Sequence, residues 1–274
     1  MAVKRSRSGP SGHVYRVDGE RVPGVTTILK MAPHDALVGW AGRVTAEYAL
    51  DFWDELAELK PSERLRRMQA ARFEIRDKAA RRGTEVHRLA EQLVGGDEVT
   101  VPEELAGHVE AYRDWLDAIE PVPVATELVV ASRTHRYCGT SDLIADLPPI
   151  LIGAELVPAA RWLLELKTTA SGVWPESALQ ATAYRRAEVY VHPEHPDDEQ
   201  PMDLLGIERA GVVWIKSDMA ELRPVDTSDA TWEVFVHLRW LFDQMERDSG
   251  GNLKLPSHWI GDAVSAADLE AARA

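Results

Sequence analysis

The spacing of apolar residues divides the chain into a helical first half and a strand-rich second half. In the first half, apolar side chains recur at intervals of three and four residues, which is typical of amphipathic helices. Pro61-Ser62 interrupts this pattern and Gly95-Gly96 ends it. Asp18-Gly19 stands earlier, between two β-rich runs, and predicts a hairpin. The predicted elements are strands at 14–17 and 24–29 and helices over 36–59, 63–94 and 103–119.

The second half alternates shorter runs of β-branched and aromatic residues with turns, which is typical of strands. Three successive runs predict an antiparallel meander, and the segment around Pro148-Pro149 predicts an excursion at its second turn. A helix is expected to begin at Pro175. The chain is therefore expected to be a mixed α/β domain with a helical elaboration. The predicted elements are strands at 124–131, 137–147, 161–167 and 211–216 and helices at 175–191 and 231–245.

The ends of the chain differ in composition from the middle. Residues 1–12 are basic and rich in Ser and Gly, which predicts a flexible N-terminus, and residues 249–274 predict a loosely structured tail with one further helix. We expect a single domain over 13–248. Its helical elaboration covers about 36–119 and its core about 80–248.

Composition and charge exclude several classes of protein. The 31 Lys and Arg against 45 Asp and Glu give a net charge of −14, which argues against a protein that coats nucleic acid non-specifically. The single cysteine, Cys138, can form neither an internal disulfide nor the four-thiolate site of an iron–sulfur cluster. No apolar run approaches the roughly 20 residues that span a bilayer, and no apolar stretch of a signal peptide follows Met1. We therefore expect a cytoplasmic protein without a membrane partner.

Basic residues are nevertheless concentrated in one predicted helix. Residues 63–88 contain nine Lys and Arg and only four Asp and Glu. This segment could present a positive stripe to a phosphate partner, or it could be a solvated helix face with internal ion pairs.

The first candidate for chemistry is Glu165-Leu166-Lys167. A carboxylate and an amine two residues apart on a strand project to the same face. The pattern is short and occurs by chance, and Glu58-Leu59-Lys60 is a second copy in a helical region before a proline. Only the copy at Glu165 lies in a predicted strand.

An acid in the preceding strand strengthens this candidate. Asp142 lies in an apolar strand, where a carboxylate is costly unless it is paired or bound to metal, although it could also cap a turn after Gly139-Thr140. If the strands are antiparallel, Asp142 and Glu165 can converge on one hard cation that the Leu166 carbonyl could also reach. Oxygen ligands of this kind suit Mg²⁺ or Mn²⁺.

Four further residues are weaker candidates. His87 could add a nitrogen ligand that favours Mn²⁺, or it could be structural. Glu127 taken alone could be a surface strand residue. Gln180 and Tyr184 stand four apart on a predicted helix and share a face, so both can look towards Lys167, although the pair could equally be ordinary helical polar residues.

Taken in order, these short motifs resemble the PD-(D/E)xK nuclease superfamily and its RecB-like exonuclease branch in particular. Ser141 replaces the proline of the family's name and leaves the acid in place. The matching motifs are Gly-Thr-x-x-His at 83–87, Glu127, Gly-Thr-x-Asp at 139–142, Glu-x-Lys at 165–167 and Gln-x-x-x-Tyr at 180–184.

The resemblance implies a restriction-endonuclease-like core, which is a mixed sheet flanked by helices. It also implies a Mg²⁺- or Mn²⁺-dependent DNA exonuclease that hydrolyses phosphodiester bonds in phage or bacterial recombination, repair or replication. His87, Asp142, Glu165 and the Leu166 carbonyl would hold one or two ions, and Lys167 would position the attacking water. Glu127 would orient a metal-bound water or assist a second ion. The residues implied to contact DNA are Gln180, Tyr184, Arg81, Arg82 and Arg88.

The chain has no Gly-Lys-Ser/Thr phosphate loop, so any unwinding would require a separate helicase or recombination protein. Two other functions remain open. One is a structure-specific or nicking endonuclease of the same fold, and the other is a non-enzymatic adaptor that binds host replication or repair proteins.

Overall fold

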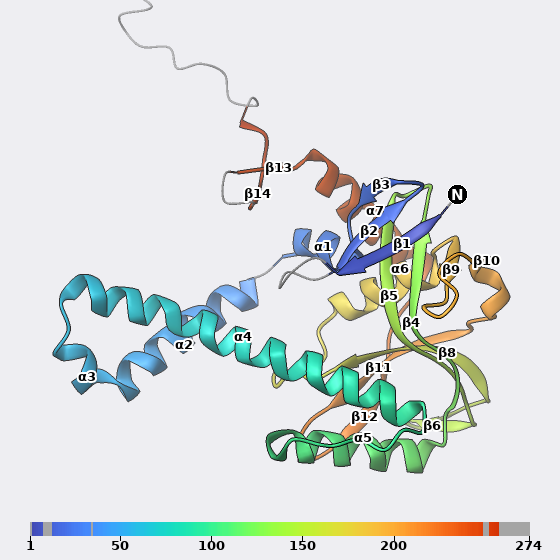
Figure 1. Ribbon diagram of the computed structural model, residues 1–274, viewed down its shortest axis with the longest axis horizontal. Coiled ribbons are helices and arrows are strands. Elements are labelled where there is room, and N and C mark those ends of the chain that lie inside the picture. The colour runs from blue at the N-terminus through green and yellow to red at the C-terminus, as the bar shows by residue number, and fades with distance from the viewer. Residues whose placement is uncertain (1, 8–12, 34, 249–251, 258–274) are drawn as a thin grey trace, which may run out of the picture.

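A computed structural model describes residues 2–7, 13–33, 35–248 and 252–257. It is an α/β structure built on a mixed sheet of seven strands in the order β10-β9-β4-β5-β8-β11-β12 (Figure 1). This agrees with the expected α/β class. The strands are β4 (Val122–Ser132), β5 (Tyr137–Leu147), β8 (Ala160–Lys167), β9 (Val189–Val191), β10 (Glu199–Pro201), β11 (Arg209–Ile215) and β12 (Ala220–Pro224).

The predicted meander forms the centre of this sheet. β4 pairs antiparallel with β5, and β5 pairs antiparallel with β8 in a register that places Leu143 opposite Leu164. The chain then crosses over through α6 (Glu176–Arg185) to β11, which is parallel to β8. The expected excursion is a separate hairpin of β6 (Ile150–Ile152) and β7 (Glu155–Val157).

Helices cover both faces of the sheet, which explains why six of the eight positions of β8 are buried. Leu164 and Leu166 pack with α5 (Ala106–Ile119) and the C-terminal part of α4 (Pro61–Val94). Leu163 instead packs on the other face with α6 and α7 (Asp229–Gln244). Because side chains alternate along a strand, Glu165 and Lys167 belong to the α6 face.

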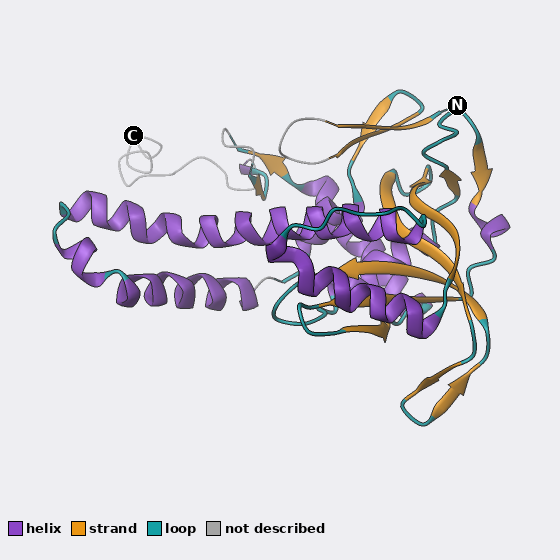
Figure 2. Cartoon of the chain, turned by 60° about the horizontal axis from the view of Figure 1, so that its bottom comes forward, coloured by secondary structure: helices purple, strands orange, loops and turns teal. Residues whose placement is uncertain are grey.

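A helical arm projects from this core, and we define it as residues 35–80. It consists of α2 (Asp35–Asp51), α3 (Trp53–Ala57) and the N-terminal part of α4, folded as a long hairpin (Figure 2). The helix predicted over 36–59 is interrupted at Phe52. Few apolar side chains of the arm are buried, among them Val44, Leu56 and Ala71.

The predicted hairpin at Asp18-Gly19 is present, with a different second strand. β2 (His13–Val17) pairs with β3 (Glu20–Val22), and positive φ angles of 52° and 86° at Asp18 and Gly19 fit the two-residue turn that joins them. The strand predicted over 24–29 is wrong. This segment forms α1 (Val25–Ile28) and a 3₁₀ turn, η2 (Leu29–Met31), and its apolar residues are buried at helical spacing.

The N-terminus also differs from the expectation of a flexible segment. β1 (Val3–Arg7) pairs antiparallel with β2, and Val3 is only 3% exposed. Burial of Val3 against the sheet thus orders a stretch that composition alone marks as polar and mobile. Residues 1 and 8–12 lie outside the described part of the chain.

The helix predicted over 175–191 ends at Arg185, because the next apolar residues form β9 and pair with the edge of β4. Short 3₁₀ helices, η3 (Glu103–Leu105) and η4 (Met202–Leu205), and a small ladder of β13 (Glu246–Arg247) and β14 (Leu253–Lys254) complete the elements. The further helix predicted near the C-terminus lies outside the described residues. Across the described ranges, no helix is long and apolar enough to cross a membrane.

Candidate active site

The site forms where β5 and β8 stop pairing. The paired register ends at Leu143 and Leu164, so Asp142 and Glu165 stand next to one another beyond the ladder. The Leu166 amide donates to Asp142 Oδ2 at 2.8 Å, and the Asp142 amide donates to Glu165 Oε1 at 3.4 Å. Two carboxylates thus take the place of the carbonyls of a regular sheet, which fixes both acids on the backbone of the neighbouring strand.

Glu165 and Lys167 project to one face, as the two-residue spacing predicts. Lys167 Nζ lies 3.5 Å from Glu165 Oε2. Gln180 on α6 bridges them, because its amide nitrogen donates to Glu165 Oε2 at 2.6 Å and its carbonyl accepts from Lys167 Nζ at 3.0 Å. The second copy of the motif has no such setting, since Glu58 ends α3 and Lys60 is exposed on the arm.

Tyr184, which the resemblance implies to contact DNA, is buried in this structure. It is 3% exposed, and a Cβ added at Gly139 would lie 2.2 Å from its ring. The absence of a side chain at Gly139 therefore makes room for Tyr184. The Tyr184 hydroxyl accepts from Gln180 Nε2 at 3.1 Å. In this arrangement Tyr184 positions Gln180, and Gln180 positions the acid and the lysine.

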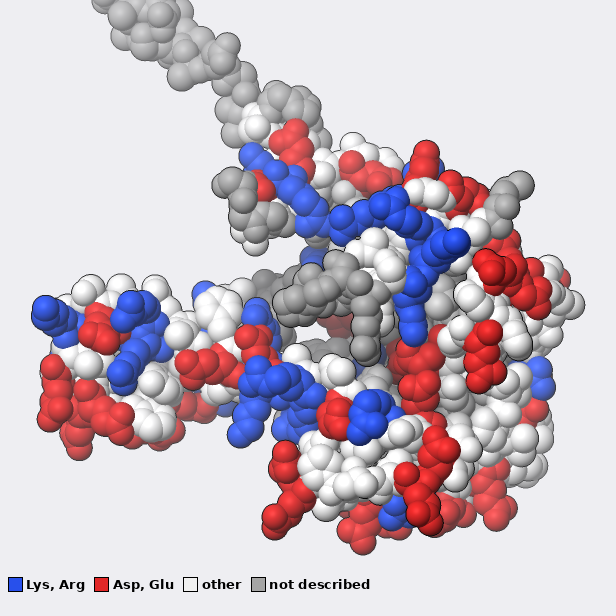
Figure 3. All heavy atoms as spheres, viewed as in Figure 1, with Lys and Arg blue, Asp and Glu red and all other residues white. Residues whose placement is uncertain are grey.

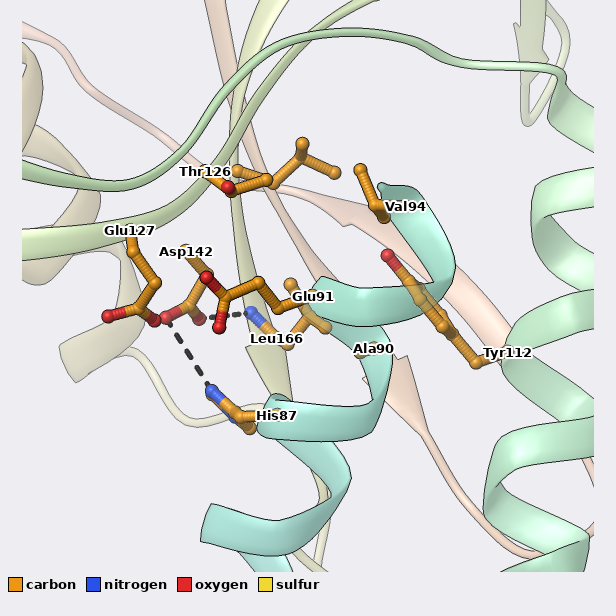
Figure 4. Close-up of a pocket in the computed structure, with 10 residues that line it drawn as sticks. His87, Ala90, Glu91, Val94, Tyr112, Thr126, Glu127, Asp142 and Leu166 are labelled. Carbon is orange, nitrogen blue, oxygen red and sulfur yellow. Dashed lines mark hydrogen bonds and ion pairs between the residues drawn. The ribbon is translucent and has the colours of Figure 1, made fainter. Parts of the chain in front are cut away.

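His87 approaches the same point from α4, on the other side of the opening. Its Nδ1 lies 3.5 Å from Asp142 Oδ1 (Figure 4). Gly83 brings α4 close to the end of β8, since a Cβ there would lie 3.2 Å from Thr168 Oγ1. Helix and sheet thus meet through a glycine one turn from the histidine.

Burial and neighbouring charges shift the pKa values of His87, Asp142 and Glu165. Burial lowers the pKa of His87, but the Asp142 carboxylate outweighs it and leaves the pKa above its ordinary value. Burial raises the pKa of Asp142, yet the charges of His87 and Lys167 and the Leu166 amide hold that pKa below its ordinary value. Burial and then the Asp142 charge raise the pKa of Glu165 well above its ordinary value. Two adjacent carboxylates therefore compete for one charge, and a cation would relieve this competition.

Glu127 lies beside Asp142 on the next strand, with a left-handed backbone angle of φ 51° (Figure 4). Its Oε2 accepts from Arg5 Nη1 at 2.7 Å, and Arg5 also donates to Thr140 Oγ1 at 3.2 Å. Sequence reasoning missed Arg5. It lies 122 residues from Glu127, in a segment whose sequence contains no motif that indicates a site. The pairing of β1 with β2 brings it close to Glu127.

A fourth acid, Glu91, was also missed. It follows His87 by four residues on α4 and lines the same narrow pocket as Glu127 and Asp142 (Figure 4). Burial raises its pKa, as does the charge of Glu127. The spacing of four from His87 was the signal that could have identified it.

The three arginines expected to contact DNA are not gathered at the site. Arg88 donates to Glu85 and Gln92 on its own helix. Arg82 lies on the side of α5. Burial lowers the pKa of His108 on that helix, and the charge of Arg82 lowers it further. Arg81 is exposed and makes no ion pair within the described ranges.

The donor atoms are of the kind that Mg²⁺ and Mn²⁺ prefer, namely carboxylates, an imidazole nitrogen and a main-chain carbonyl. Within residues 2–7, 13–33, 35–248 and 252–257, no three His, Cys, Asp or Glu side chains are already gathered as a metal site. Asp142 and His87 face the pocket, whereas Glu165 is held by Gln180 and Lys167. The donor atoms of this set suit a divalent cation in their chemistry.

Comparison of the sequence with models of known protein families and with curated proteins found no match. The interpretation of the site therefore depends on its own geometry and on the ordered motifs that fall within it.

Proposed function

We propose that this protein is a metal-dependent deoxyribonuclease that hydrolyses phosphodiester bonds in linear DNA from its ends. One observation carries the proposal. Asp142, Glu165 and Lys167, which the chain separates by 25 residues, meet in one hydrogen-bonded cluster with His87 and Gln180. This is the set that the resemblance to RecB-like exonucleases implies, and the restriction-endonuclease-like core is part of the same proposal.

Asp142, Glu165, His87 and the Leu166 carbonyl would hold the cation. When bound, the ion would polarise the scissile phosphate and lower the pKa of the attacking water. The Asp142 carboxylate is the ready ligand, because its lowered pKa keeps it ionised. Burial and the Asp142 charge raise the pKa of Glu165, and a bound ion would favour its ionised form, since metal binding displaces protons from its ligands.

Lys167 would contribute the positive charge that the reaction needs. Gln180 fixes its ammonium group 3.0 Å from an amide oxygen. An ammonium group held in this way would need little reorganisation when negative charge develops on the pentavalent phosphorus. Gln180 and Tyr184 are positioning residues in this account, since both are buried and neither offers a surface to DNA.

The test uses end-labelled linear DNA and closed circular DNA with Mg²⁺, Mn²⁺ or EDTA. We expect linear DNA to be degraded with either metal and to stay intact in EDTA, while closed circles resist. Equal cutting of closed circles would replace this proposal with an endonuclease. No cutting with either metal would favour a non-enzymatic adaptor.

A further inference from the structure

One face of α4 runs from the site into the arm. Positions 69, 73, 76, 80, 83 and 87 are separated by four and three residues in turn, so they lie along one side of the helix. At the core end of this face, His87 approaches Asp142 and Gly83 approaches Thr168, next to Lys167. The arm end of the face therefore continues in line with the site.

At the arm end, this face carries an exposed aromatic ring between two arginines. Phe73 is 42% exposed. The guanidinium carbon of Arg72 lies 4.6 Å from the ring centroid, and that of Arg76 lies 5.1 Å from it. We call these three residues the Phe73 platform. Arg76 also pairs with Asp77 at 2.7 Å. Ala71 is buried on the same helix, whereas the ring of Phe73 is partly in solvent.

The charge around this platform is opposite to that of the whole protein. Residues 63–88 carry nine Lys and Arg against four Asp and Glu, on a chain of net charge −14. Figure 3 shows basic side chains at the tip of the arm and where the arm joins the core, with acidic side chains between the two groups. Some of them have structural roles: Arg64 donates to the carbonyls of Leu56 and Ala57, and Arg66 pairs with Glu63. Among the described residues, Arg67, Arg72, Lys78 and Arg81 make no ion pair.

We infer that the Phe73 platform binds single-stranded DNA, and that one strand runs along this face of α4 from the platform to the site. The inference rests on the proposed nuclease function and names the form of its substrate. Both guanidinium groups lie over the ring, so an unpaired base that stacks on Phe73 would take the place of one of them. The displaced guanidinium group would then contact a phosphate of the same strand. Bases within a duplex are already stacked on one another and do not offer that surface.

The length of the helix sets the span of this strand. Phe73 and His87 are 14 residues apart on α4, which at 1.5 Å per residue is about 21 Å. That distance corresponds to at most about six nucleotides at the 3.4 Å spacing of one B-DNA strand. The binding strength of single strands should therefore rise with length until this span is covered.

The test measures binding in EDTA of a length series of single-stranded oligonucleotides, from shorter to longer than this span. Phe73→Ala should weaken binding of the long strands by about 5- to 100-fold, the value of one lost stacking contact. The matched control is Ile75→Ala, another exposed apolar residue of the same helix, which should bind like the wild type. Phe73→Trp should retain binding, because it keeps an aromatic face.

The arginines are tested by the dependence of binding on salt. Arg72→Gln should reduce the magnitude of the slope by about 0.7, the value for one phosphate contact on a single strand. Arg67→Gln removes the same charge from another face of α4 and should change the slope less. Circular dichroism checks that each variant is folded.

Three results would overturn the inference. Phe73→Ala and Ile75→Ala could have the same effect, or Phe73→Ala could weaken duplex binding as much as single-strand binding. The third is that Phe73→Ala abolishes self-association in sedimentation without changing DNA affinity, which would assign the face to a second copy of the chain. All three are measured without metal. Failure of the nuclease proposal is separate, since it would appear as Phe73-dependent binding without cleavage in Mg²⁺ or Mn²⁺.

Discussion

The sheet around the candidate site and the helical arm use their side chains in opposite ways. In α6, which packs on this sheet, most residues are buried and two of them, Gln180 and Tyr184, form part of the site. The arm instead leaves large apolar side chains in solvent, including Leu50, Trp53 and Phe73. Packing thus determines which residues the core can tolerate. The arm contributes little to the core, and the proposed binding of single-stranded DNA would account for its exposed rings and charges.

The largest expected effect is a difference in the rate of DNA cleavage between variants of two lysines that lie in the same Glu-Leu-Lys motif. Lys167→Ala should lower the rate of DNA cleavage by about 100- to 1,000-fold or more, because it removes a preorganised charge beside the reacting phosphate. Lys60→Ala is the matched control on the arm and should keep nearly full activity. Equal rates for the two variants would show that the site lies elsewhere.

Replacing a glycine by alanine should change the free energy of unfolding in opposite directions in the two regions. At Gly139, an added Cβ would lie 2.2 Å from the ring of Tyr184, so Gly139→Ala should lower the free energy of unfolding by about 1–3 kcal/mol. At Gly39, inside α2, an added Cβ meets nothing within 4 Å. Gly39→Ala should therefore raise the free energy of unfolding by roughly 0.5–1 kcal/mol. Urea denaturation measures both values, and destabilisation by Gly39→Ala would contradict the account of an open arm.

A smaller effect concerns the pH dependence of stability at the boundary between α4 and the sheet. Despite its burial, His87 has a pKa above its ordinary value because of Asp142, so the folded protein holds this proton more tightly than the unfolded chain. The resulting stability is complete below the ordinary histidine pKa of 6.5 and is lost as the pH rises through the raised pKa.

In EDTA, His87→Gln should therefore destabilise the protein by up to about 1 kcal/mol on the acid side of that range and by less on the alkaline side. The control is His195→Gln, in an exposed loop. A cost of His87→Gln that stays constant with pH would show that the contact with Asp142 is not an ion pair.

The sequence predicts the elements of the core well, because the helical spacing of three and four residues and the strand spacing of two can both be recognised within a short segment. The strand over 137–147 has the bounds of β5, and the spacing of Glu165 and Lys167 predicts their shared face. By contrast, the segment 24–29, predicted as a strand, is largely helical. A short apolar run is compatible with both a helix and a strand, and only its packing in the fold determines which one forms.

Contacts between distant segments could not be predicted in this way. Arg5 reaches Glu127 only because a polar N-terminal segment adds a strand to a small sheet. Tyr184 on α6 is buried because Gly139, on β5, leaves space for its ring. Neither effect leaves a pattern within one window of the sequence.

The most direct test of the account is whether Asp142 holds a divalent cation. Calorimetric titration with Mn²⁺ should show binding to the wild type, and Asp142→Asn should abolish it or weaken it at least about tenfold. Asp146→Asn, the matched control, removes the same charge from the same strand at a site paired with Arg161 and should bind Mn²⁺ like the wild type. If Asp142→Asn binds Mn²⁺ as tightly as the wild type, the metal site and the mechanism built on it are wrong.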